Sequence, residues 1–167
     1  MVVSVVRVVL TSVILCDDAV DHQITEIVLG SNNKKIDNPR TPADWLTRDE
    51  AIVDAYLNNP LDTFLFTVNG FYEMFISIQG AQHREFVAKI RKDLPLFLVS
   101  GAEDPVGGYG KGVTKAYERY LVAGISDVTL KLYPEDRHEI LNELDRETVY
   151  ADLLTWMEER ISSADAR

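Results

Sequence analysis

The chain has 167 residues, 46% of them hydrophobic, which is the composition of a globular protein with room for one buried core. Its 17 basic and 27 acidic residues leave a net charge of -10, which opposes binding to the phosphate backbone of a nucleic acid. The one cysteine, Cys16, allows no internal disulfide, so we expect a cytoplasmic protein and no oxidising compartment.

The opening segment, residues 1–15, is rich in valine but contains Arg7. It is shorter than the roughly 20 residues of a membrane-spanning helix, and the basic start of a secretory signal is missing. We therefore interpret it as a core or interface segment and expect no membrane span. A secretory signal is the less favoured alternative.

Asp17, Asp18, Asp21 and His22 follow this segment. Asp18 and His22 would share one face of a helix and could offer ligands to a metal. A solvated helix start is favoured, because acidic side chains are stabilised there by the helix dipole. The same acids disfavour a reactive thiolate at Cys16, so we expect a buried structural cysteine, no metal and no cofactor.

The next part of the chain is predicted to be helical and aromatic. Thr47 and Glu50 have the spacing of a capping box, which predicts a helix over residues 48–58 that ends before Pro60. A stretch rich in aromatic residues, 64–75, is interpreted as core, and a further amphipathic helix is expected over residues 83–91.

From residue 93 onward strands and helices alternate. An apolar run at 96–99 and an alternating run at 128–132 predict two parallel strands, with a helix over 111–122 between them. Asp145 is expected to cap a last helix. The predicted class is α/β, with two parallel strands and flanking helices (93–167) preceded by an apolar segment and a helical region (1–92). Two strands are too few for an independent sheet, so we expect an exposed edge to pair with something else.

The loops that follow the two strands carry the side chains that could take part in catalysis. Asp104 lies in the first loop and His138 in the second. The carboxyl ends of parallel strands meet at one edge of the sheet, where reactive groups gather. An acid on one loop and a histidine on the next is the order of a hydrolase triad after its serine.

Two sequence stretches extend this pattern. The first runs SGAEDPVG at 100–107 with GKGV at 110–113, and the second runs VTLKLYP at 128–134 with DRHEILNE at 136–143. They resemble the monoacylglycerol lipase, lysophospholipase and serine aminopeptidase group of α/β hydrolases. Upstream, SNNKK at 31–35 and WLTRDE at 45–50 resemble the helical cap of the same group.

This resemblance implies that Asp104 is the triad acid and His138 the triad base, and that the substrate is a lipid-like ester such as a monoacylglycerol or lysophospholipid. The family nucleophile lies in a G-x-S-x-G elbow, but no serine of this chain stands between two glycines at that spacing. We therefore expect a hydrolase segment that is inactive alone. The alternative is a non-catalytic remnant that dimerises or pairs with a partner through its sheet edge.

The glycine-rich stretch 107–112 offers another interpretation, because it follows a strand and opens a helix as a phosphate loop does. Pro105 stands where the first glycine of such a loop belongs, and Gly112 replaces the hydroxyl residue that would hold magnesium. We expect these glycines to let the backbone turn close to Asp104.

Overall fold

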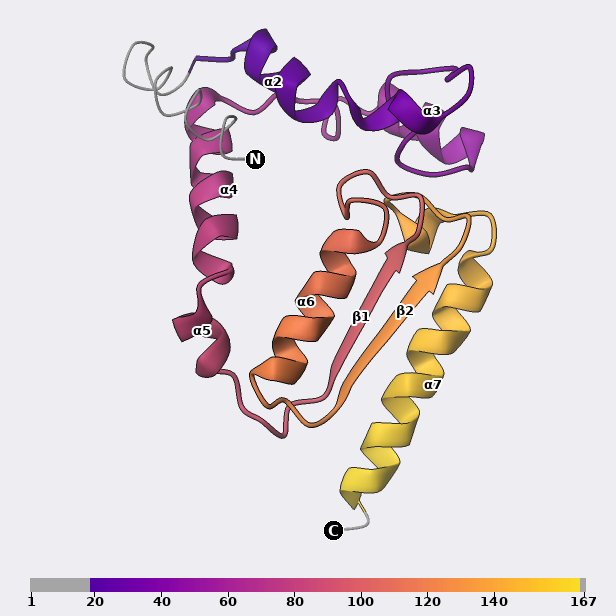
Figure 1. The fold of residues 1–167 in the computed structure, drawn as a ribbon. Helices are drawn as coiled ribbons and strands as arrows, with labels where there is room; N and C mark the ends of the chain where they lie inside the picture. Colours follow the sequence, from indigo (N-terminus) through magenta and orange to yellow (C-terminus); the bar gives the residue numbers. More distant parts are fainter. Residues whose placement is uncertain (1–18, 166–167) are drawn as a thin grey trace.

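The computed structural model describes residues 19–165 (Figure 1). The apolar segment 1–15, Cys16, Asp17 and Asp18 lie outside the described residues. The elements in chain order are α2 (His22–Leu29), the 3-10 helix η1 (Asn32–Lys35), α3 (Glu50–Asn58), α4 (Val68–Ala81), α5 (Arg84–Ala88), β1 (Leu96–Gly101), α6 (Lys111–Val122), β2 (Val128–Tyr133), the 3-10 helix η2 (Ile140–Asn142) and α7 (Arg146–Asp165).

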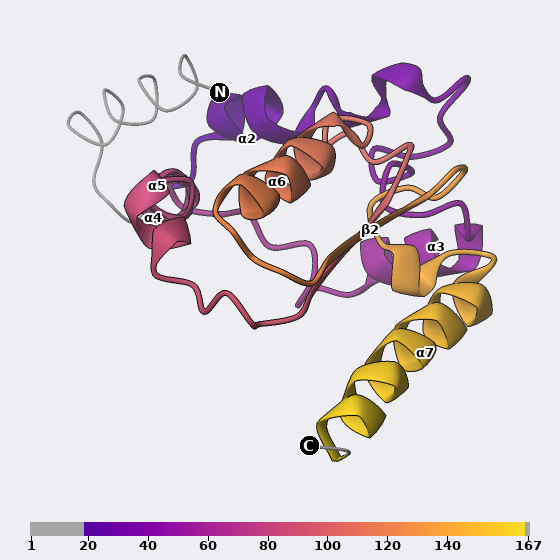
Figure 2. The same ribbon diagram turned by 60° about the horizontal axis from the view of Figure 1, so that its bottom comes forward.

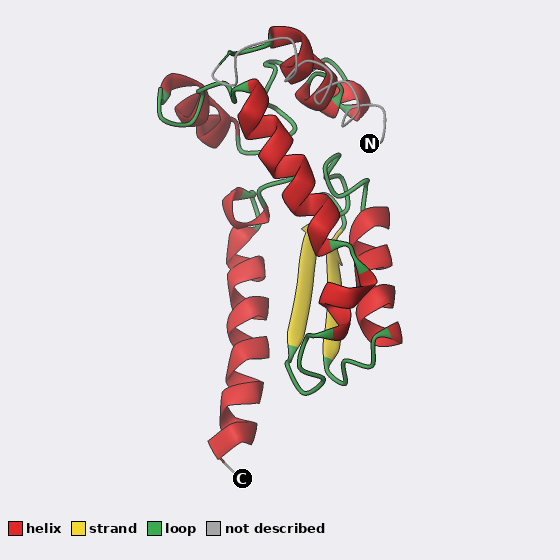
Figure 3. Ribbon diagram, turned by 90° about the vertical axis from the view of Figure 1, so that its left-hand side faces the viewer, coloured by secondary structure: helices red, strands yellow, loops and turns green. Residues whose placement is uncertain are grey.

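The two strands form a parallel sheet in which Leu96 pairs with Val128 and Gly101 with Tyr133. Helix α6 covers one face of the sheet and α7 the other, so this part of the chain has three layers (Figure 3). Each strand has one edge without a neighbouring strand among residues 19–165. The two predicted strands and the connecting helix are therefore confirmed, as is the open sheet edge.

Helix α7 packs on the sheet through one aromatic side chain. The indole of Trp156 stacks on Phe97 of β1 with ring centroids 5.2 Å apart, and its Nε1–H donates to Thr129 Oγ1 of β2 at 3.2 Å. Closer to the end of β2, the side chains of Tyr133, Ile140 and Val149 form a buried cluster. The carboxyl end of the sheet is thereby fixed against both η2 and the start of α7.

The helical half has two hydrophobic clusters of its own. One joins α2 to α4 through Ile24, Val68, Phe71 and Phe75, and the other joins α3 to the preceding turn through Ala43, Leu46 and Val53. With the sheet cluster, the described part of the chain (19–165) contains three small hydrophobic clusters, in place of the single core expected from chain length. Phe64 and Phe66 are exposed, so the prediction that the aromatic stretch is all core is wrong for these two rings.

Two helix predictions require correction. Helix α3 begins at Glu50, and its N-cap is Asp49, whose carboxylate accepts from the N–H groups of Ala51 and Ile52. Thr47 therefore does not form a capping box; its hydroxyl donates to the carbonyl oxygen of Asn142 at 2.9 Å, 95 residues away. Helix α5 is also shorter than the expected span of 83–91.

The last helix begins directly after Asp145, as predicted, but the side chain of Asp145 bonds to another part of the chain. Asp145 stands directly before α7, yet its carboxylate accepts a hydrogen bond from Arg48 at 2.6 Å. Helix α3 lies beside this end of α7 in Figures 1 and 2, and Arg146 pairs with Asp49 across the gap at 3.1 Å. Of the helices over residues 19–165, none combines the length and the apolar character needed to cross a bilayer.

Gly101 ends β1 at a point where the two loops approach closely. A Cβ atom at this position would lie 2.1 Å from the carbonyl oxygens of Asp136 and Arg137, which are backbone atoms of the neighbouring loop. Only glycine allows this approach, because a methyl group needs more than 3 Å.

We predict that Gly101→Ala lowers the free energy of unfolding by about 2 kcal/mol or more, since an overpacked site must displace backbone. The matched control is Gly80→Ala, where a Cβ would meet nothing within 4 Å. Alanine at this helical position should instead stabilise the protein by about 0.5 kcal/mol. Urea unfolding followed by circular dichroism measures both, and equal effects of the two substitutions would contradict the argument.

Candidate functional site

Asp104 is held inside the loop that follows β1. Its Oδ1 accepts from the N–H of Val106 at 2.8 Å and its Oδ2 from the N–H of Gly107 at 3.0 Å. The carboxylate is buried, with 6% of the residue exposed. A Cβ on Gly107 would lie 2.9 Å from Asp104 Oδ2, so this glycine allows the backbone to wrap around the acid.

Four further N–H groups of the loop are also occupied. Gly108 donates to Pro105, Tyr109 to Asp104, Lys111 to Gly108 and Gly112 to Gly107, each through a backbone carbonyl. A phosphate loop needs such groups to be free for its ligand. The glycines at 107–112 therefore shape the loop around Asp104, as the sequence suggested.

His138 reaches Asp104 from the loop that follows β2. Its Nδ1 lies 3.1 Å from Asp104 Oδ1, so the two side chains predicted from the sequence form a hydrogen-bonded pair across the sheet edge. The ring is in contact with Trp45, with centroids 5.0 Å apart, and 37% of the side chain is exposed. Asp136, two residues before His138, bonds to Arg48 and not to His138.

The interaction between Asp104 and His138 favours the charged form of each side chain: it lowers the pKa of Asp104 and raises the pKa of His138. Burial by itself would raise the pKa of Asp104, but the hydrogen bond and charge of His138 and two backbone N–H groups hold it below its ordinary value. The hydrogen bond to Asp104 raises the pKa of His138, against the effect of burial. A carboxylate on Nδ1 leaves Nε2 of the same ring as the atom able to accept a proton.

A short segment of the helical half, residues 44–48, lines the other side of the His138 loop. Glu139 N–H donates to the carbonyl oxygen of Leu46 at 2.7 Å, and His138 N–H donates to that of Trp45 at 3.4 Å. The guanidinium of Arg137 donates to the carbonyl oxygens of Asp44 and Thr47. The loop that carries His138 is therefore bonded to backbone that lies about 90 residues earlier in the chain.

Glu143 joins the two segments from inside. It is 0% exposed, and its Oε1 accepts from the backbone N–H of Arg48 at 3.1 Å and of Arg137 at 2.9 Å. Its Oε2 accepts from Nε of Arg48 at 2.8 Å and from the N–H of Leu144 at 3.1 Å. A buried carboxylate requires such complete pairing, because an uncompensated charge in the interior is costly.

Arg48 is the central cation of an acidic cluster. Besides Glu143, it bonds to Asp136 at 2.7 Å, Asp145 at 2.6 Å and Glu135 at 3.1 Å. Asp136, Glu143 and Asp145 each have an oxygen within 4.8 Å of the others, which is a spacing able to hold a metal ion. Here the guanidinium bonds to all three, so Arg48 supplies the positive charge to this group.

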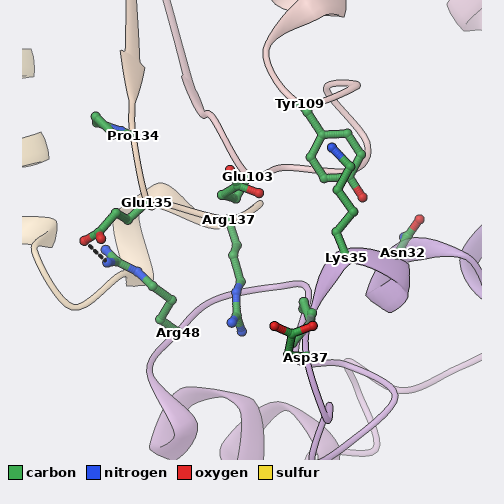
Figure 4. Close-up of a pocket in the computed structure, with 10 residues that line it drawn as sticks. Asn32, Lys35, Asp37, Arg48, Glu103, Tyr109, Pro134, Glu135 and Arg137 are labelled. Carbon is green, nitrogen blue, oxygen red and sulfur yellow. Dashed lines mark hydrogen bonds and ion pairs between the residues drawn. The ribbon is translucent and has the colours of Figure 1, made fainter.

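A polar cavity of about 490 Å³ separates η1 from the two loops (Figure 4). Figure 4 shows Lys35 reaching up to Tyr109, whose ring centroid lies 3.3 Å from the lysine Nζ, and the ion pair between Arg48 and Glu135 at the opposite side. Asp104 and His138 are not among its lining residues. The cavity therefore lies beside the pair and does not contain it.

The metal alternative near His22 depends on Asp17 and Asp18, which lie outside the described residues, so it stays untested. Among the described residues, α2 begins at His22. Asp21 is the N-cap of α2, where it accepts from the N–H of Gln23 at 2.7 Å.

Sequence reasoning identified Asp104 and His138 but missed Arg48, Glu143 and Trp45. All three fall within the stretches that resemble the hydrolases, yet nothing local in the sequence marks their contacts, because Arg48 and Glu143 are 95 residues apart. A charged residue in a predicted loop is ordinarily solvated. Only the fold shows that Glu143 is buried.

We predict that Asp136→Asn removes a pH dependence of stability. Burial, aided by Asp145 and Glu143, raises the pKa of Asp136 to about 7, and its Oδ2 has no donor among the described residues. The folded protein thus retains a proton that the unfolded chain loses near pH 4, and the stability from this group is full below pH 4 and is lost as pH rises through about 7. Asparagine mimics the protonated form and keeps the oxygen that accepts from Arg48.

Urea unfolding between pH 4 and 9 measures this effect. The variant should come closest to the natural chain at pH 4, and its advantage should grow as pH rises to about 7, reaching about 1 kcal/mol or more at pH 8. Glu135→Gln, in the same loop but with a side chain that is 82% exposed, should keep the natural profile. An unchanged slope in Asp136→Asn would show that Asp136 is ionised throughout this range.

The chain is similar to solved structures of an esterase and of lipases. The chain aligns with a carboxyl esterase from Bacillus coagulans, solved with glycerol, at 28% identity and a TM-score of 0.78, over 86% of this chain and 47% of the esterase. It is also similar to a lipase in an open form (24%, TM-score 0.79, 92% and 50%) and to a monoglyceride lipase from Saccharomyces cerevisiae (23%, TM-score 0.53, 81% and 48%).

The chain thus spans about half the length of these solved structures. The two parallel strands with α6 and α7 correspond to part of the α/β-hydrolase fold, as the sequence predicted. The family model described as serine aminopeptidase, S33, matches residues 8–145, which include both loops of the Asp104–His138 pair. The chain belongs to this S33 family of α/β hydrolases.

Proposed function

We propose that Asp104 and His138 act as the acid and base of a serine hydrolase that cleaves carboxylic esters. The observation that carries the proposal is the 3.1 Å contact between His138 Nδ1 and Asp104 Oδ1, made by two loops that leave adjacent parallel strands. The backbone N–H groups of Val106 and Gly107 keep Asp104 ionised and oriented. Asp104 then fixes the proton on Nδ1 and stabilises the imidazolium that forms during the reaction.

In this reaction Nε2 of His138 takes the hydroxyl proton of a serine as the serine oxygen attacks the ester carbonyl. The resulting tetrahedral intermediate expels the alcohol, which receives that proton, and an acyl-enzyme remains. Water then attacks the acyl group with His138 again as base, releasing the carboxylic acid and restoring the serine. The chain supplies the proton carrier and its orienting carboxylate for both halves of this cycle.

The serine belongs, in this proposal, to a segment that the 167 residues do not contain. No serine of the sequence has the G-x-S-x-G spacing. Among the described residues, the hydroxyl of Ser126 donates to Lys92 at the opposite end of β2, and that of Ser100 donates to Gly101. The chain alone should therefore not hydrolyse esters.

The proposed substrate class is a lipid-type ester, such as a monoacylglycerol or a lysophospholipid. Support comes from the exposed rings of Phe64 and Phe66, which contact each other and lead through Phe71 into the buried cluster between α2 and α4. Apolar rings open to solvent suit an acyl chain. In this proposal residues 1–92 form the cap region that lines the acyl pocket, and residues 93–167 belong to the catalytic core.

We predict that the purified chain is not labelled by a fluorophosphonate, which reacts with activated serines. A chimera tests the positive side: the part of the Bacillus coagulans esterase that this chain does not cover is fused to it, and p-nitrophenyl ester hydrolysis is measured. His138→Ala in the chimera should lower kcat by about 10⁴-fold. Labelling of the isolated chain, or a folded chimera that is inactive or insensitive to His138→Ala, would contradict the proposal.

A second candidate function is a non-catalytic interaction module. It is favoured by the open edges of the two-stranded sheet and by exposed apolar side chains such as Leu61 and Val122, at 79% and 90% exposure. Such surfaces often pair with another chain.

Light scattering coupled to size-exclusion chromatography distinguishes the two candidate functions, because it measures whether the chain is a dimer or a monomer. A module that pairs through its sheet edge should elute as a dimer at micromolar concentration, because the open strands would hydrogen-bond to each other. A folded monomer that is stable at the same concentration would count against self-association.

A further inference from the structure

We propose that Glu143 is a positioning residue for His138: it holds the imidazole against Asp104 by tying the β2 loop to residues 44–48. The inference rests on the proposed role of His138 as base, and it adds a residue whose four hydrogen bonds go to Arg48, Arg137 and Leu144 and not to the pair itself. Its basis is the set of four donors that Glu143 gathers in the protein interior.

Those donors come in equal numbers from the two segments that the carboxylate joins. Arg137 and Leu144 contribute backbone N–H groups from the β2 loop, at 2.9 and 3.1 Å. Arg48 contributes its backbone N–H and its Nε, at 3.1 and 2.8 Å. Charge-assisted hydrogen bonds of this kind are about twice as strong as neutral ones, so Glu143 forms a strong link between the segments from inside the protein.

The position of His138 depends on this link because its own backbone is held loosely. The N–H of His138 lies 3.4 Å from its acceptor on Trp45, at the long end of the hydrogen-bond range. The residues on both sides are held more tightly: Arg137 N–H bonds to Glu143 at 2.9 Å, and Glu139 N–H bonds to Leu46 at 2.7 Å. Releasing the first of these leaves the backbone on one side of the histidine without its anchor, and only the side chain of Arg137 still bonds to Asp44 and Thr47.

A small movement is sufficient to break the pair. Hydrogen bonds between nitrogen and oxygen are effective between about 2.7 and 3.2 Å, and the His138–Asp104 contact already measures 3.1 Å. Asp104 is fixed separately, by Val106 and Gly107 of its own loop. The backbone N–H of Glu103 also donates to the carbonyl oxygen of Asp136 at 2.9 Å, which ties the start of the two loops together. A displacement of the β2 loop after Asp136, at Arg137 and His138, is not followed by the acid, and the distance between the two side chains increases.

The test is a histidine titration of the intact chain by NMR, which reports the pKa of His138 directly. The chain has three histidines, and a His138→Gln variant assigns the resonance. Because the hydrogen bond to Asp104 raises the pKa of His138, Asp104→Asn sets the value of a ring without its partner. Glu143→Gln should lower the midpoint most of the way to that value, since an amide NH₂ cannot accept the bonds that one carboxylate oxygen now receives.

Two controls separate positioning from charge and from general stability. Glu135→Gln removes a carboxylate from the same loop, from a side chain that is exposed, and should leave the midpoint of His138 unchanged. Arg48→Lys keeps the positive charge and the backbone N–H but removes the Nε donor to Glu143. It should lower the midpoint in the same direction as Glu143→Gln and by a smaller amount.

A folded Glu143→Gln variant whose His138 midpoint equals that of the natural chain would overturn the proposal, because Glu143 would then serve stability only. If circular dichroism shows that Glu143→Gln does not fold, Arg48→Lys decides, and an unchanged midpoint in that variant is the contrary result. The readout is the titration of one ring in this chain. It is therefore independent of whether the chimera hydrolyses esters, and failure of either idea is seen separately.

Discussion

The buried carboxylate of Glu143 is the constraint on which the arrangement of the site depends. A fully buried charge is tolerated only when its partners are complete, and removal of one partner of such a pair costs about 3–5 kcal/mol. Glu143 meets this requirement with donors from two parts of the chain 95 residues apart. The segment 44–48 therefore has to lie against the β2 loop whenever the chain is folded, and the contacts of Trp45, Leu46 and Thr47 with that loop follow from it.

Close approach of the two loops is the second requirement, and glycine meets it. Gly101 lets the carbonyl groups of Asp136 and Arg137 pass at a distance that excludes any side chain. Gly107 lets the following backbone fold over Asp104, and Gly108, Tyr109 and Gly110 complete the turn with positive φ angles. The hydrogen bond between Asp104 and His138 thus depends on backbone geometry at residues outside the pair.

The strands, the helix between them and the two reactive loops were predictable because their signals are local. An apolar run at 96–99, alternation at 128–132 and the order of acid and histidine each depend on a few consecutive residues. The capping box at Thr47 was wrong for the opposite reason. A threonine and a glutamate at this spacing satisfy the local pattern. In the folded chain, however, Thr47 donates to the carbonyl oxygen of Asn142 and accepts from the N–H of Asp49, and Asp49 caps the helix.

The same distinction explains why the pair of Asp104 and His138 was predicted while Arg48 and Glu143 were not. Asp104 and His138 each lie in a loop that directly follows a strand, which is a position that the sequence pattern marks. Arg48 and Glu143 need only lie close enough to bond to each other, and residues at many other loop positions could do the same. Their pairing becomes visible through burial, since Glu143 is wholly enclosed whereas Glu135, in the same loop and bonded to the same arginine, is 82% exposed. Glu143 and Glu135 have the same charge and share Arg48 as a partner, but they are not equivalent. The buried Glu143 has to keep every hydrogen bond, whereas the exposed Glu135 can exchange its bond for water. A buried residue of this kind can therefore fix the position of one segment relative to another.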